Sequence, residues 1–193
     1  RIFKRIDLTS RTLITLIEPG SCYAGFLSEL IFAADRSYMA EGEFEEYDNK
    51  EATIILSISN FGSFLMSNDM SRIDTRFIGS PEQILLAKQN LDKQILAEEA
   101  NDLGLITFMF DDIDWEDEIR IFLEERSSFS PDSMVGMESN LRFPGKETME
   151  TKIFGRLSAW QNWIFQRPSA VGENGALKKY GTGNKGQYTK ERT

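Results

Sequence analysis

Three side chains able to do chemistry, Glu18, Cys22 and Glu29, lie close together in one segment of the chain. In that segment, residues 16–35, an apolar stretch, a Pro-Gly turn and a loop of small residues lead into an apolar helix start. Such a loop presents backbone N–H groups at the beginning of a helix, where they can face an oxyanion or another negative group. An ordinary strand–turn–helix crossover has the same pattern, so the residues alone leave both interpretations open.

The chain has no histidine and only one cysteine, which limits the chemistry it can perform. Without histidine, Ser-His-Asp and Cys-His nucleophilic chemistry and the usual zinc sites are excluded within this chain. The single Cys22 excludes an internal disulfide framework and fits a reducing, cytoplasmic compartment. Any catalysis would therefore use carboxylates, backbone dipoles, hydroxyls or the lone thiol.

Composition and charge exclude several further classes of function. A length of 193 residues with 40% hydrophobic side chains is enough for one sizeable α/β domain, with or without an appendage. The net charge of −9 argues against nucleic-acid binding as the main activity, and no apolar run is long enough to cross a bilayer. The acidic run at 41–51 shows no fixed ligand spacing, so we expect a solvated loop there and no metal site.

The periodicity of apolar residues predicts alternating strands and helices in the first part of the chain. Apolar, β-branched stretches predict strands at 12–17, 36–40, 53–58 and 105–110. Helical spacing predicts helices at 25–34, 70–78 and 96–103, and a further one beginning at Ser80-Pro81. The first strand, helix and strand indicate a right-handed crossover in an α/β fold. The start of the chain, residues 1–8, is typical of the last turns of a helix that begins further upstream.

The character of the chain changes after residue 113, where amphipathic helices replace the alternation. One helix is predicted at 115–126 with Ile119, Phe122 and Leu123 facing inward, followed by a helix starting at Ser130-Pro131 and another at 148–166. The Gly- and Lys-rich end is typical of an extended tail. We therefore expect three parts: a core at 1–113, a helical extension for packing or oligomerisation at 114–177, and a basic tail at 178–193.

Two groups of residues carry a resemblance to a known family. The loop Glu18–Cys22 followed by Glu29-Leu30 and Ala33–Arg36 resembles the strand–loop–helix of the crotonase (enoyl-CoA hydratase/isomerase) superfamily. The stretches 111–115, 141–165 and 167–181 resemble the C-terminal region of the benzoyl-CoA-dihydrodiol lyases, a ring-cleaving family within that superfamily. The resemblance implies a crotonase-like ββα spiral domain, partial at its N-terminus, with a C-terminal helical extension and tail.

The resemblance also implies an activity. These lyases hydrolytically open the oxygenated, dearomatised ring of a benzoyl-CoA derivative, which yields a semialdehyde CoA thioester and formate. The CoA thioester is the substrate, and no redox cofactor is needed. The family protein is longer and has a second crotonase-like half, so an upstream half with the principal catalytic groups and a cytoplasmic homodimer are expected. In the family pattern, the backbone N–H groups of Gly25 and Phe26 take the place of the oxyanion donors.

The sequence departs from the crotonase pattern at two positions. Phe26 introduces a bulky side chain where simpler crotonases have glycine, and Ile58 stands where they often have a catalytic glutamate. For Glu29 a packing or salt-bridge role is expected, for Glu18 a polar contact, and for Cys22 a small buried residue rather than a nucleophile. The catalytic residues of this chain are therefore left unassigned.

Three functional hypotheses remain open from the sequence. The chain is part of the ring-cleaving lyase, a non-catalytic scaffold and oligomerisation module, or a generic enoyl-CoA hydratase or isomerase, and Ile58 argues against the last. The aromatic residues of the 148–166 helix are expected in a core or an interface rather than around a ligand. The tail is expected to be solvated, with contact to CoA phosphates as the alternative, through Lys178, Lys179, Lys185, Lys190 and Arg192.

Overall fold

The computed structural model describes residues 2–48, 50–145 and 147–189. The chain forms two compact units. The first comprises Arg1–Leu8 and Leu13–Ile119, and the second comprises Thr9–Thr12 and Arg120–Thr193. No helix among the described residues is both long and apolar enough to span a bilayer.

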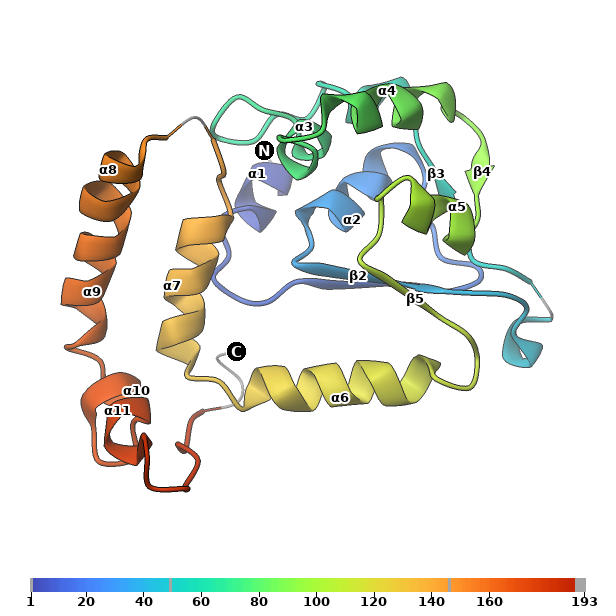
Figure 1. The fold of residues 1–193 in the computed structure, drawn as a ribbon. Helices are drawn as coiled ribbons and strands as arrows, with labels where there is room; N and C mark the ends of the chain where they lie inside the picture. Colours follow the sequence, from blue (N-terminus) through green and yellow to red (C-terminus); the bar gives the residue numbers. More distant parts are fainter. Residues whose placement is uncertain (1, 49, 146, 190–193) are drawn as a thin grey trace. The chain divides into compact units, whose positions relative to one another are not determined.

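A three-stranded parallel sheet forms the centre of the first unit (Figure 1). Its strand order is β1 (Ile14–Ile17), β2 (Arg36–Ala40), β5 (Phe108–Phe110), with Ile14 opposite Arg36 and Tyr38 opposite Phe108. Buried Ile17 and Met39 lie in its core. The strand predicted at 36–40 is confirmed with its bounds, and those predicted at 12–17 and 105–110 are present but begin later, at Ile14 and Phe108. The first two pair in parallel, as predicted.

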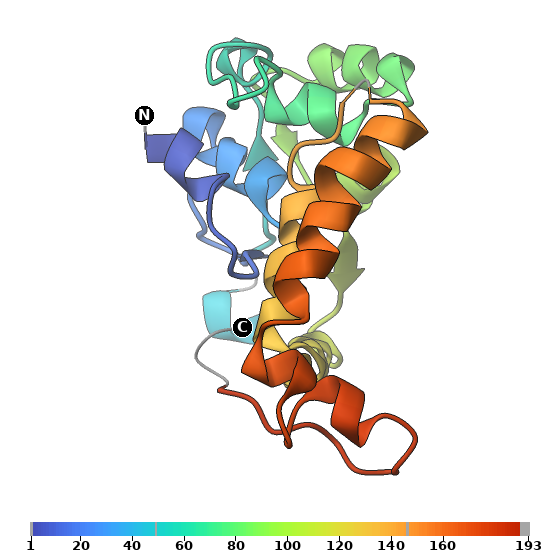
Figure 2. The ribbon, with the colours of Figure 1, turned by 90° about the vertical axis from the view of Figure 1, so that its left-hand side faces the viewer.

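Short helices surround this sheet, and two of them, α1 and α2, are neighbours in Figures 1 and 2. Their bounds are α1 (Ile2–Ile6), the 3-10 turn η1 (Gly25–Ser28), α2 (Glu29–Ala33), η2 (Glu45–Tyr47), α3 (Arg72–Arg76), α4 (Pro81–Gln89) and α5 (Ala97–Asp102). Each predicted helix is present, although the one at 25–34 begins as a 3-10 turn. Pro81 opens α4 as predicted, but the Ser80 side chain makes no capping hydrogen bond. Residue 1 of the predicted N-terminal helix lies outside the described residues.

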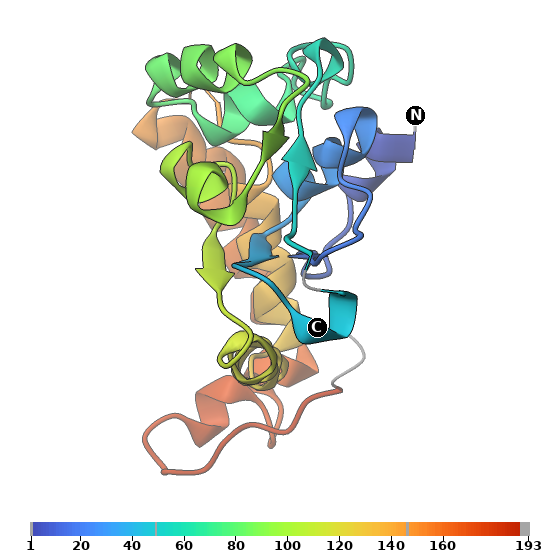
Figure 3. The same ribbon diagram turned by 90° about the vertical axis from the view of Figure 1, so that its right-hand side faces the viewer.

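A second, two-stranded antiparallel sheet pairs β3 (Ile54–Ile55) with β4 (Gln94–Ile95) (Figure 3). The strand predicted at 53–58 is therefore too long. Its end turns into the 3-10 segment η3 (Ile58–Asn60), which is closed by a capping box between Ser57 and Asn60. Hydrogen bonds that the nearby backbone N–H groups donate to the Ser57 and Asn60 side chains compete with strand pairing, which explains the early end of β3.

Helix α6 (Trp115–Ser127) begins in the first unit and ends in the second. The elements of the second unit that follow it are all helical. The remaining elements are α7 (Pro131–Leu141), α8 (Met149–Lys152), the π-type turn η4 (Ile153–Leu157), α9 (Ser158–Ile164), α10 (Pro168–Val171) and α11 (Ala176–Lys179). Figure 2 shows α8, η4 and α9 as one continuous helix, as predicted for 148–166. The prediction that Leu123 faces inward is wrong, because its side chain is 50% exposed while Ile119 and Phe122 are half-buried.

A glycine allows α7 and α9 to approach closely. A Cβ atom at Gly136 of α7 would overlap the indole ring of Trp160 on α9. That indole stacks on Trp163 with a centroid distance of 4.5 Å, and the Arg167 guanidinium carbon lies 4.8 Å from the centroid of the Trp163 ring. Phe154 of the same helix is largely exposed and therefore lies outside the core of this unit.

The basic tail predicted at 178–193 is described only as far as residue 189. Lys178 and Lys179 belong to α11, and Lys185 is exposed in the segment that follows it. Lys190 and Arg192 lie outside the described residues, so any contact that they make with CoA phosphates stays a prediction.

Candidate functional site

The loop between β1 and α2 is held against β3 by backbone and side-chain hydrogen bonds. Gly20 has a φ of +84°, a left-handed conformation that glycine adopts readily, and the Ser21 N–H donates to the Glu18 carbonyl, 3.0 Å away. Further along the loop, the Ile55 N–H donates to the Tyr23 carbonyl (3.0 Å). The Ser28 hydroxyl donates to the Ile55 carbonyl (2.9 Å). The loop is therefore tied to β3 at its middle and at its end.

Gly25 and Phe26, the predicted oxyanion donors, are the first two residues of η1. Gly25 has a φ of +55°, which a residue with a side chain rarely adopts. The Phe26 side chain is 54% exposed, and its ring lies 6.4 Å from the Phe3 ring, between centroids. The Phe26 ring therefore packs beside α1, and the oxyanion role of the two N–H groups stays a prediction.

Glu29 lies at the centre of a buried network of charged and polar side chains. Its side chain is fully buried, and each carboxylate oxygen accepts one hydrogen bond. The Arg72 Nη1 atom donates to Oε2 (2.8 Å), and the Asn60 Nδ2 atom donates to Oε1 (2.8 Å). Glu29 thus forms the kind of salt bridge expected for it from the sequence.

Arg72 connects Glu29 to two further parts of the first unit. Its Nε and Nη2 atoms donate to the two carboxylate oxygens of Asp7 (2.9 and 2.6 Å), and Nη1 also donates to the Phe64 carbonyl (3.0 Å). The Arg72 and Asp7 side chains are each 1% exposed. This bidentate geometry is the strong form of an arginine–carboxylate pair.

Asn60 extends the network to the oxyanion loop. Its Nδ2 atom donates to the Gly25 carbonyl (2.9 Å) as well as to Glu29, and its Oδ1 atom accepts from the Ser57 N–H (2.9 Å). Gly25 is therefore held through its own carbonyl by a side chain that Glu29 and Arg72 keep in place. We call Asp7, Glu29, Asn60 and Arg72 the Arg72 network.

Burial shifts the titration of Glu29. Desolvation raises the pKa of its carboxyl above the ordinary value of 4.5, against the hydrogen bonds from Asn60 and Arg72, which lower it. The folded state then binds this proton more tightly than the unfolded state does. The contribution of Glu29 to the free energy of unfolding is therefore complete below pH 4.5 and falls as the pH rises through the raised pKa.

This titration predicts a pH-dependent difference between the natural protein and the Glu29→Gln variant. In urea unfolding between about pH 4.5 and pH 8, the free energy of unfolding of the natural protein should fall relative to that of the variant as the pH rises. The Gln side chain keeps the shape and has no titrating proton, so it serves as the reference. A difference that grows in favour of the natural protein with rising pH would contradict the assignment.

Glu18 makes the polar contacts expected of it. Its Oε1 atom accepts from the indole Nε1 of Trp115 (3.0 Å), and its Oε2 atom accepts from the Tyr47 hydroxyl (3.4 Å). The Trp115 ring packs edge-on against Phe44, with a centroid distance of 6.2 Å. The carboxylate therefore fastens the turn after β1 to the start of α6.

Two further expectations require correction or refinement. Cys22, expected to be a small buried residue, is exposed. It follows the Pro-Gly turn, where the chain leaves the core before η1 begins. Ile58 is 69% exposed in η3, not paired in a strand. Its side chain has no proton to transfer, wherever it lies.

The sequence reasoning missed Arg72, Asn60 and Asp7. The sequence gives only a weak local signal for them, since Arg72 stands beside the apolar Ile73. Asp7 likewise follows Phe3 at the helical spacing of four residues. Within the described part of the chain, no group of three or more Asp, Glu or Cys side chains is placed to hold a metal ion.

Comparisons with known proteins relate the chain to one enzyme and to one fold. The chain is 52% identical over 188 residues to benzoyl-CoA-dihydrodiol lyase of Aromatoleum evansii, which covers 97% of this chain and 33% of that protein. The chain thus spans about a third of the length of the relative it matches. No protein-family model matches the chain.

Solved structures show the same fold at low sequence identity. Enoyl-CoA hydratase of Bacillus anthracis superposes with a TM-score of 0.65 at 15% identity, over 96% of this chain and 65% of that one. An enoyl-CoA hydratase/isomerase of Mycobacterium paratuberculosis gives 0.64 at 12% identity, over 95% and 63%. The crotonase-like α/β fold expected from the sequence is therefore confirmed, and it is partial relative to these chains.

Proposed function

We propose that this chain, which has the crotonase fold and matches a benzoyl-CoA-dihydrodiol lyase along nearly its whole length, is part of such a lyase. The identity of 52% carries this proposal. The reaction is the hydrolytic opening of the oxygenated, dearomatised ring of a benzoyl-CoA derivative, with a semialdehyde CoA thioester and formate as products. The substrate is the CoA thioester itself, and the reaction uses no redox cofactor.

Within that enzyme, we assign this part of the chain a mainly structural and positioning role. Both carboxylate oxygens of Glu29 are occupied by donors from Arg72 and Asn60, so a proton transfer through Glu29 would first have to break the buried network. Ile58 supplies no acid or base. The principal acid and base groups of the enzyme are therefore proposed to belong to a further crotonase-like part of the protein.

The oxyanion loop is the feature through which this part would contact a thioester. Backbone N–H groups aimed at an enolate oxygen stabilise its developing negative charge, and such preorganised donors are often the largest single contribution to catalysis. Gly25 and Phe26 are the donors proposed for this chain. The Asn60 bond to the Gly25 carbonyl supports the proposal, because it fixes the backbone conformation of the loop.

A scaffold role in a cytoplasmic homodimer is the second candidate function. Large apolar side chains of the α8–α9 helix are exposed on the second unit, namely Met149 (69%), Phe154 (75%), Leu157 (51%) and Phe165 (53%). Exposed apolar groups of this size are typical of contact surfaces. Scaffold and lyase roles are compatible, since a structural part belongs to an active enzyme.

The lyase proposal is tested by the products formed from an oxygenated, dearomatised benzoyl-CoA substrate. The full-length protein carrying this chain is expected to release formate and a semialdehyde CoA thioester in equal amounts, measured by mass spectrometry. Hydration of crotonyl-CoA without ring opening would contradict the lyase proposal in favour of a generic hydratase.

Two variants test the positioning role. Glu29→Gln is expected to keep kcat within about tenfold of the natural enzyme, whereas loss of a general acid or base costs about 10²–10⁴-fold. Cys22→Ser changes the loop that leads into α2 and is the control; it is expected to leave kcat unchanged. A loss of about 10³-fold in Glu29→Gln, with its folding intact, would make Glu29 a catalytic residue.

A further inference from the structure

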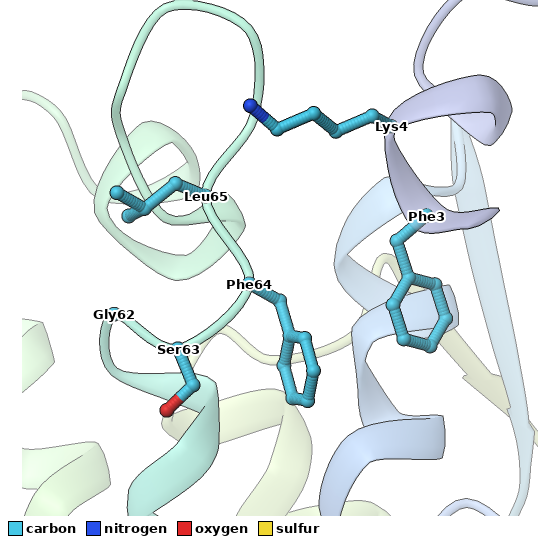
Figure 4. A pocket seen from close by; sticks show the side chains of 6 residues that line it. All are labelled: Phe3, Lys4, Gly62, Ser63, Phe64 and Leu65. Carbon is cyan, nitrogen blue, oxygen red and sulfur yellow. The ribbon is translucent and has the colours of Figure 1, made fainter. Parts of the chain in front are cut away.

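A hollow of about 280 Å³ opens in the first unit between α1 and the loop that follows η3 (Figure 4). It is lined by Phe3, Lys4, Gly62, Ser63, Phe64 and Leu65. The rings of Phe3 and Phe64 meet edge to face, with a centroid distance of 5.4 Å. An apolar cavity of about 150 Å³ in an engineered protein takes up benzene, so this hollow has room for a six-membered ring.

The two walls of the hollow are held in place by one side chain. Arg72 binds Asp7, the residue that follows α1, and donates to the Phe64 carbonyl in the opposite wall. Its guanidinium carbon also lies 5.6 Å from the centroid of the Phe3 ring. Walls that are fixed before a ligand arrives lower the entropic cost of binding, because little of the site must be ordered afterwards.

The surroundings of the hollow are apolar on one side and cationic on another. Phe26 packs beside Phe3 and is 54% exposed, and Leu65 is 37% exposed. In Figure 4 the Lys4 side chain extends from α1 across the mouth toward the 62–65 loop. A ligand with a flat apolar end and an oxygen-rich, anionic end matches both features, because rings pack well against phenylalanine and anions are attracted to an ammonium group.

We propose that this hollow binds the ring of a cyclic acyl-CoA thioester, with Lys4 facing the oxygen-rich end of the ligand. The proposal rests on the proposed function, which supplies the CoA thioester as the class of ligand. It adds that this part of the chain selects a ring over a linear acyl chain. Edge contacts with Phe3 and Phe64 provide the selection, since a linear chain gains no ring–ring interaction.

Hydrogen exchange measured peptide by peptide on the full-length protein tests this proposal, because it separates this hollow from any other CoA site. Benzoyl-CoA is expected to slow amide exchange in peptides that cover residues 2–8 and 62–65, and hexanoyl-CoA at equal occupancy is expected to have much less effect. In Phe64→Leu, the benzoyl-CoA concentration needed for half of this protection should rise about five- to tenfold.

Two variants serve as controls for folding and for the role of the cation. Phe129→Leu changes a 42% exposed phenylalanine of the second unit and should leave the protection of 2–8 and 62–65 unchanged. Lys4→Met changes an exposed side chain and should raise the benzoyl-CoA concentration needed for half of the protection about two- to fivefold. This difference from the natural protein should vanish at high salt, which screens the charge of the ammonium group. Thermal unfolding of each variant checks that the fold is retained.

The outcomes separate this proposal from the proposed function. Unchanged exchange at 2–8 and 62–65 under saturating benzoyl-CoA, or equal protection by hexanoyl-CoA, would overturn the hollow as a ring site. Formate release from the ring substrate would still support the lyase in that case. Conversely, protection of the hollow by benzoyl-CoA, together with no ring opening of the oxygenated, dearomatised substrate, would support the ring site and contradict the lyase reaction.

Discussion

Replacing Arg72 by methionine is expected to lower the free energy of unfolding by about 3–5 kcal/mol, as is usual when a buried ion pair loses one partner. The variant leaves the carboxylates of Asp7 and Glu29 buried without their shared cation. It also removes the donor to the Phe64 carbonyl. Urea unfolding at neutral pH measures the loss.

An exposed arginine provides the matched control for this variant. Arg120 pairs with Glu124 at 3.2 Å, and its side chain is 57% exposed, so Arg120→Met should change the unfolding free energy by no more than about 0.5 kcal/mol. The triple variant Asp7→Leu, Glu29→Leu, Arg72→Met should recover most of the stability, because a well-packed apolar set often replaces a buried ion network without loss. A cost below about 1 kcal/mol for Arg72→Met would contradict the structural role given to the network.

Replacing Gly136 by alanine is expected to destabilise the second unit by about 2 kcal/mol, within the range found for overpacked cores. The added Cβ would overlap the indole ring of Trp160, so that ring must leave its place and its stacking on Trp163. Alanine has a helix propensity about 1 kcal/mol better than that of glycine, which offsets part of this cost. The loss is measured as a shift of the urea midpoint.

A second glycine of the same unit separates the overlap from the helix propensity. Gly155 lies in the helical segment η4 and has open space where its Cβ would stand, so Gly155→Ala should be neutral or stabilise by up to about 1 kcal/mol. Adding Trp160→Leu to Gly136→Ala should cost less than the sum of the two single changes, since the smaller side chain relieves the overlap. Strictly additive costs would show that Trp160 does not cover Gly136.

The sequence was most informative where side-chain pattern and backbone geometry coincide. The β-branched run ending at Ile17 and the run ending at Ala40 form neighbouring parallel strands, the first half-buried on one face and the second buried along nearly its whole length. Pro81 at the start of α4 and Gly104 after α5, with a φ of +69°, mark helix ends through their own backbone preferences. Such signals are local, so no tertiary contact is needed to interpret them.

The Arg72 network was out of reach of that reasoning because its members are far apart in the chain. Asp7, Glu29, Asn60 and Arg72 meet only after α1, α2, η3 and α3 have packed together. Charged residues are mostly exposed in proteins, so each one taken alone is expected at the surface. Periodicity identifies which face of a helix is buried, but it does not show which buried charge finds which partner.

The expectations for Cys22 and Leu123 failed for related reasons. Small size and an apolar neighbourhood favour burial of a cysteine, yet Cys22 lies in the loop segment that leaves the core between β1 and η1. Leu123 lies next to half-buried Phe122 on α6, and one position along a helix turns a side chain away from its neighbour by more than a quarter of a circle. In both cases tertiary placement outweighs residue type.

The distribution of the three tryptophans gives the second unit an optical signal of its own. Trp115 belongs to the first unit, and its indole N–H is bound by the Glu18 carboxylate, whereas Trp160 and Trp163 belong to the second unit and stack at 4.5 Å. Two indole rings at that distance couple electronically and give an exciton couplet in the far-ultraviolet circular dichroism spectrum, which a lone indole cannot give. This couplet would therefore report on the second unit alone, whereas tryptophan fluorescence, to which all three indoles contribute, would report on both units. If they changed at different urea concentrations, one unfolding free energy for the whole chain would lose its meaning.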